Sequence, residues 1–88
     1  METETYNGWK NRQTWNVALW ISNDEALYQV AREYAVDARR RGGRARYSFF
    51  IRYAGLGGSK TPDGISYLGT RLDYEALDAM LQELGEGE

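Results

Sequence analysis

Two stretches of the chain place apolar residues at the spacing of an amphipathic helix. The first predicts a helix over residues 23–41, because its apolar positions recur three and four residues apart. Ser22 or Asn23 is expected to begin this helix, with Ser22 and Glu25 forming a capping box. Gly42 and Gly43 are expected to end it. The apolar positions are Leu27, Val30, Ala31, Tyr34, Ala35 and Ala38.

The second amphipathic stretch lies near the C-terminus. Leu77, Met80, Leu81 and Leu84 fall on one stripe, which predicts a helix with Asp73 as its N-cap and Gly85 as its stop. Residues 86–88 are expected to fray. Acids between the apolar positions, such as Asp78, are expected to face solvent.

The remaining segments are less periodic. Residues 14–22 are apolar on most sides, which fits a short buried helix, although a strand stays open. Residues 44–54 fit either a helix or a strand, and we favour a helix because no second strand of similar length is evident. Residues 61–64, Thr-Pro-Asp-Gly, predict a turn, and the glycines at 55–58 a loop. The prediction is a mainly α fold of about four short helices, with an α+β fold containing a small hairpin as the alternative.

Composition limits the chemistry that this chain can perform. Its 88 residues make one domain, 1–88, in which residues 1–5 are expected to fray. Cysteine and histidine are absent, which excludes disulfides, thiolate nucleophiles, zinc–thiolate sites and the usual general base near neutral pH. We therefore expect no enzymatic activity, no catalytic or metal-binding residues and no cofactor. Without a long apolar run or a signal-like N-terminus, we expect the cytoplasm and no membrane partner.

All three tryptophans lie in one short segment, at positions 9, 15 and 20. Each can bury a large area while its indole N–H needs a partner, and short polar residues such as Asn11 and Thr14 stand nearby. We expect Trp15 and Trp20 to be core residues. Trp9, between Gly8 and Lys10, is the candidate for a partner contact, since an exposed tryptophan is a typical interface anchor.

Charge is distributed unevenly along the chain, although the net charge is −2. Residues 39–52 carry a charge of +6 with no acid, and residues 72–88 carry −6 with no base. Intramolecular pairing of these two regions is the first interpretation, a protein partner the second, and nucleic acid the third. The candidate partner-binding residues are Trp9, Lys10, Arg39, Arg40, Arg41, Arg44, Arg46 and Arg52.

The opening segment, Asn-Gly-Trp-Lys-Asn-Arg-Gln-Thr-Trp-Asn-Val-Ala-Leu-Trp-Ile-Ser-Asn-Asp from residue 7, resembles a group of short proteins carried by bacteriophages and other mobile elements. The Thr-Pro-Asp-Gly turn and residues 72–80, Leu-Asp-Tyr-Glu-Ala-Leu-Asp-Ala-Met, are similar to the closing region of that group. The resemblance implies a small protein that acts on a host or phage component. It supplies no catalytic residues.

Taken together, these observations favour a non-catalytic protein-binding module of phage type. Its expected role is to inhibit a host complex, as antirestriction and anti-CRISPR proteins do. The alternative is a nucleic-acid-binding accessory protein that uses the arginine and aromatic residues of segment 39–53. A homodimer is a further partner that the sequence leaves open.

Overall fold

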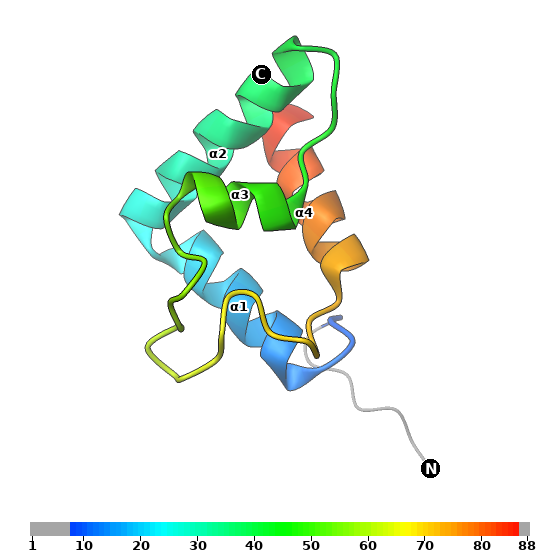
Figure 1. Ribbon diagram of the computed structural model, residues 1–88. Coiled ribbons are helices and arrows are strands. Elements are labelled where there is room, and N and C mark those ends of the chain that lie inside the picture. Colours follow the sequence, from blue (N-terminus) through cyan, green and yellow to red (C-terminus); the bar gives the residue numbers. More distant parts are fainter. Residues whose placement is uncertain (1–7, 87–88) are drawn as a thin grey trace.

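Four helices make up the fold: α1 (Arg12–Asn23), α2 (Glu25–Arg40), α3 (Tyr47–Tyr53) and α4 (Tyr74–Glu86). The structure, a computed structural model, describes residues 8–86 (Figure 1). The predicted mainly α fold is confirmed. An isolated antiparallel bridge joins Lys60 to Ser66 on either side of the predicted turn. Of the frayed ends predicted at 1–5 and 86–88, residues 1–5 and 87–88 lie outside the described residues, whereas Glu86 is the last residue of α4.

A single residue, Asp24, joins α1 to α2. Its backbone N–H donates to the carbonyl of Trp20 at 3.0 Å and so closes α1. Its carboxylate accepts the amide of Leu27 at 3.1 Å and so begins α2. The predicted cap at Ser22 or Asn23, with its capping box, is therefore wrong. Both residues belong to the last turn of α1, because the two helices follow each other without a loop.

Glycines end α2 and α3 as predicted. Gly42, with φ +81°, follows α2, and Gly55, with φ +75°, follows α3. In each case the next amide, that of Gly43 or Leu56, donates to the carbonyl five residues before it, at 3.0 and 2.9 Å. This is the Schellman arrangement, which favours glycine because the left-handed conformation is strained for residues with a side chain.

Small residues allow α2 and α4 to pack closely. Ala31 and Ala35 of α2 are buried, and Gly85 of α4 lies against Ala35. A Cβ atom on Gly85 would stand 2.8 Å from the Ala35 carbonyl oxygen. The prediction that Gly85 stops the helix is wrong, since α4 continues to Glu86. Glycine is required here by the neighbouring helix rather than by a helix end.

The short helix α3 lies against α2 and α4 (Figure 1). Its buried side chains, Tyr47, Phe50 and Ile51, point into the core. No side chain of its own caps it. Instead, Asp78 of α4 accepts the amide of Tyr47 at 2.6 Å, and Gln82 donates to the carbonyl of Ala45 at 3.1 Å. The expectation that Asp78 faces solvent is therefore wrong, because its carboxylate begins a different helix.

Candidate functional site

The Thr-Pro-Asp-Gly turn is bonded to the buried face of α1. Asn16, which is 1% exposed, donates to Asp63 at 2.7 Å and accepts from the Thr61 hydroxyl at 2.7 Å. The indole N–H of Trp20 donates to the same oxygen of Asp63 at 3.0 Å. The bonds from Asn16 and Trp20 lower the pKa of the Asp63 carboxyl, because they stabilise its charged form. These polar groups hold the turn in place.

A second set of bonds joins the start of α1 to the start of α4. Asn11 caps α1 by accepting the amide of Thr14 at 2.9 Å, and its side-chain amide donates to the carbonyl of Arg71 at 2.8 Å. The Thr14 hydroxyl accepts the amide of Asp73 at 3.0 Å. Asp73 in turn caps α4, as predicted, by accepting the amide of Ala76 at 3.2 Å. The polar residues of the opening segment are therefore used to hold the closing segment.

The tryptophans are half-buried rather than central. The core stripe of α1 consists of Thr14, Val17, Ala18 and Ile21, four positions at helical spacing. Trp15 and Trp20 fall on the flanks of that stripe, so the prediction that they are core residues is wrong. The indole of Trp20 finds its partner across the fold, at Asp63, rather than among nearby asparagines. Half-buried Trp9 packs against the core, and exposed Lys10 follows it.

The six arginines of the stretch 39–52 are all exposed, and they fall into two groups. At the end of α2, Arg41 pairs with Asp37 of the same helix at 3.1 Å. Arg39 reaches α4, where it donates to the carbonyl of Gly85 at 3.4 Å, at the negative end of the helix dipole. Arg39 and Arg44 border a depression of about 260 Å³. The group at this end of α2 comprises Arg39, Arg40, Arg41 and Arg44.

The second group lies on the outer side of α3. Phe49 and Tyr53, one turn apart, are 53% and 61% exposed, and they are the exposed large apolar side chains of residues 8–86. Arg46 precedes Phe49 by three residues, and Arg52 lies beside Tyr53 in sequence; both are exposed. We call these four residues, Arg46, Phe49, Arg52 and Tyr53, the α3 face. The sequence carried a signal for it, since a helix that buries Tyr47, Phe50 and Ile51 leaves Phe49 and Tyr53 outside.

Tyr34 of α2 contacts α3 through both its ring and its hydroxyl. Its ring centroid lies 5.6 Å from that of Tyr53 and 5.8 Å from that of Phe50. Its hydroxyl accepts the backbone amide of Arg46 at 3.2 Å and donates to the carbonyl of the same residue at 3.3 Å. The start of α3 is thereby fixed against α2. Sequence reasoning assigned Tyr34 only to the apolar stripe of its helix.

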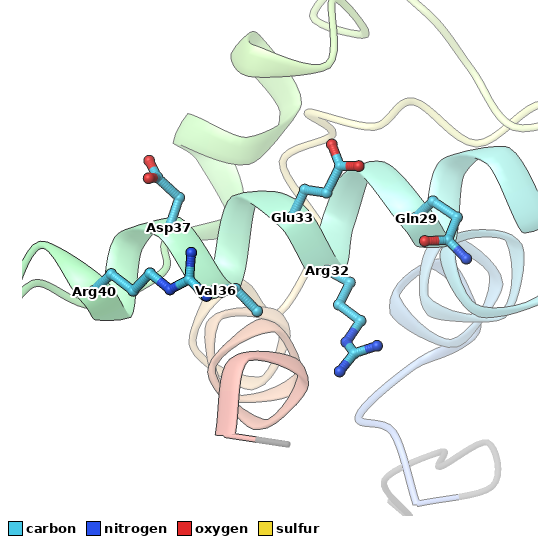
Figure 2. A pocket seen from close by; sticks show the side chains of 6 residues that line it. All are labelled: Gln29, Arg32, Glu33, Val36, Asp37 and Arg40. Atoms are coloured by element: carbon cyan, nitrogen blue, oxygen red, sulfur yellow. The ribbon is translucent and has the colours of Figure 1, made fainter. Parts of the chain in front are cut away.

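Other features of the described surface do not form a chemical site. A depression of about 340 Å³ runs along α2 alone (Figure 2). Its acids, Glu33 and Asp37, project to one side of the helix, and Arg32 projects to the other, so its polar groups do not converge (Figure 2). Among residues 8–86, no group of three or more acids is placed to hold a metal ion. In the same residues, no helix is long and apolar enough to cross a membrane.

Burial also explains the one strongly shifted group in the core. The Tyr47 side chain is fully buried, and its hydroxyl donates to the carbonyl of Tyr67. Removal from water raises the pKa of this hydroxyl, and the neighbouring Tyr74 and Tyr67 raise it further. Because the Tyr47 hydroxyl stays neutral and already donates to a backbone carbonyl, we assign this side chain a role in core packing.

These observations define the class of the molecule as a small all-α domain with one exposed aromatic and arginine face. Residues 2–88 match the family described as "Family of unknown function (DUF7249)", and the chain belongs to this family. Comparison with curated proteins and with solved structures gives no match.

Proposed function

We propose that this protein is a non-catalytic protein-binding module whose contact surface is the α3 face. The observation that carries the proposal is the pair Phe49 and Tyr53, both more than half exposed on neighbouring turns of one helix. Aromatic residues and arginine are enriched at the centres of protein interfaces, where they contribute most of the binding energy. The α3 face contains two of each.

The contacts in the rest of the fold support a contact surface on α3, because the opening and closing segments have a structural role. The opening and closing segments are joined through Asn16, Thr14 and Asn11, so the polar groups of these three side chains are already used within the fold. The α3 face lies in the segment between them. A substitution at Phe49 or Tyr53 leaves these hydrogen bonds in place, although replacing Tyr53 also removes its ring contact with Tyr34.

The class of partner in this proposal comes from the resemblance of the opening and closing segments to short phage proteins. The partner is a host protein complex, and the role is its inhibition, as in antirestriction and anti-CRISPR proteins. The class of partner and the inhibitory role are inferred from this resemblance and do not depend on the geometry of α3. An alternative target for the α3 face is a single nucleic acid strand, because exposed aromatic rings can stack on bases while arginines contact phosphates.

The test is affinity purification of the full chain from its native cells, with and without the aromatic pair. Phe49→Ala/Tyr53→Ala should reduce recovery of the partner at least about tenfold, since interface anchors contribute upwards of ~2 kcal/mol each. The matched control is Glu75→Ala/Glu83→Ala, which changes two exposed positions of α4. Circular dichroism should show that both variants remain helical.

Full recovery of the partner by a folded Phe49→Ala/Tyr53→Ala variant would contradict the proposal. Equal loss in the α4 control would contradict it as well, since the contact would then not be specific to α3.

A further inference from the structure

Building on the proposed function, we infer that the α3 face recognises an acidic segment of the partner that also carries an apolar side chain. In this arrangement carboxylates contact Arg46 and Arg52. The apolar side chain packs between Phe49 and Tyr53. The inference depends on the local charge, the extent of the face and its rigidity.

The first argument is charge complementarity. From Gly42 through Pro62 the chain contains no acid, and its four bases are Arg44, Arg46, Arg52 and Lys60. The carboxylate that approaches α3 from α4, Asp78, is already bonded to the amide of Tyr47. A carboxylate arriving at the α3 face therefore meets guanidinium groups, with which it forms strong charge-assisted bonds.

The second argument separates carboxylates from a nucleic acid. A helix of seven residues spans only about 10 Å, so the α3 face is short. The helix α4, against which α3 packs, has exposed acids at Glu75 and Glu83, and the whole chain has a charge of −2. A strand of phosphates that extends from α3 over α4 would meet these acids. A short acidic peptide segment can stay within the face, so the observations favour protein over nucleic acid.

The third argument is rigidity. Tyr34 fixes both the backbone of Arg46 and the ring of Tyr53 to α2. A surface that is already ordered loses less conformational entropy when a partner binds. The position of the Tyr53 ring and the backbone position of Arg46 are therefore set before a partner binds.

The experiment titrates the isotope-labelled full chain with three probes at physiological salt, followed by NMR. The probes are a short peptide alternating glutamate with leucine, the same peptide with lysine for glutamate, and a single-stranded oligothymidylate of similar length. Amide shifts should concentrate at residues 46–53 with the glutamate peptide. Its dissociation constant should be about tenfold lower than that of the lysine peptide.

The discriminating variant is Arg46→Glu/Arg52→Glu, which should reverse the preference between the two peptides. Tighter binding of oligothymidylate than of the glutamate peptide, or equal binding of both peptides, would overturn the inference and favour nucleic acid or a charge-independent contact.

The same variant separates this inference from the proposed function. If Phe49→Ala/Tyr53→Ala loses the cellular partner while Arg46→Glu/Arg52→Glu retains it, the protein-binding function stands and the acidic-segment inference is wrong. If the aromatic variant retains the partner, the proposed function itself is wrong.

Discussion

Replacing Thr61 with valine should destabilise the fold more than the loss of one hydroxyl usually does. The Thr61 side chain is 3% exposed, and its oxygen makes two bonds. It donates to Asn16 at 2.7 Å and accepts the amide of Ile65 at 3.1 Å. Valine has nearly the same shape, so the main effect of the substitution is to remove the two hydrogen bonds.

The expected cost follows from the groups left behind. A buried acceptor on Asn16 and a partly buried donor on Ile65 each lose a partner, at about 1–3 kcal/mol per unsatisfied group. We expect a total of about 2–4 kcal/mol, a large share of the roughly 4–13 kcal/mol available to a domain of this size. The melting temperature should fall by on the order of 10 °C or more.

Thermal and urea unfolding, followed by circular dichroism, measure this effect. The matched control is Thr70→Val, because Thr70 is exposed in the same connecting segment. A Thr61→Val protein that melts together with wild type and the control would show that water replaces the lost bonds. The proposed role of the buried polar contacts in holding the turn would then be refuted.

Three other substitutions test separate parts of the structure. Tyr47→Phe should lower the free energy of unfolding by about 1–3 kcal/mol, because it leaves a buried carbonyl unpaired. Tyr53→Phe, at an exposed site, should leave that free energy almost unchanged. The urea midpoints of the two variants measure the difference. Because folding lowers the pKa of Asp63, its charged form stabilises the fold fully above pH 3.8, the ordinary pKa of this group. This contribution is lost as the pH falls through the lowered pKa of the folded protein. Asp63→Asn should therefore flatten the acid limb of a stability profile, and an unchanged limb would exclude Asp63 as its source. Gly85→Ala should cost about 1–3 kcal/mol because its Cβ meets the backbone of α2, and a gain in melting temperature would show that the helices separate freely.

The amphipathic helices were predictable because their signal is local. The apolar stripes of α2 and α4 need only the spacing of residues along one helix. The ends of α2 and α3 were predictable for the same reason, since Gly42 and Gly55 act on the turn that precedes them. The ambiguous segment around α3 is a helix, which the absence of a second strand already favoured.

The errors concern residues whose role depends on a distant segment. Gly85 has the sequence pattern of a helix stop, yet it is needed where Ala35 approaches. Asp78 has the pattern of a solvated acid, yet it caps α3. Trp20 was expected in the core because of its size, but its indole bonds to Asp63, which is 43 residues away. No helical or strand period along the chain carries such information.

The α3 face was only partly predictable. The sequence identified the arginines and their aromatic neighbours, and it led to a list that included Arg39 and Arg44. The structure places those two at the end of α2 and leaves Arg46 and Arg52 with the exposed rings. The division arises because the chain bends at Gly42 before α3 begins.

The bonds between α1 and the segment 61–73 also set the order in which the chain can fold during its synthesis. They join residues 43 to 60 positions apart, so a long loop must close before any of them forms. The helices α1 and α2 can form early from local contacts. Asn16, however, lacks Thr61 and Asp63, and the Thr14 hydroxyl lacks the amide of Asp73, until those residues have left the ribosome. A nascent chain that stops at residue 60 therefore exposes the apolar and polar groups of α1 together, and it should be recognised by chaperones and proteases until the final helix arrives.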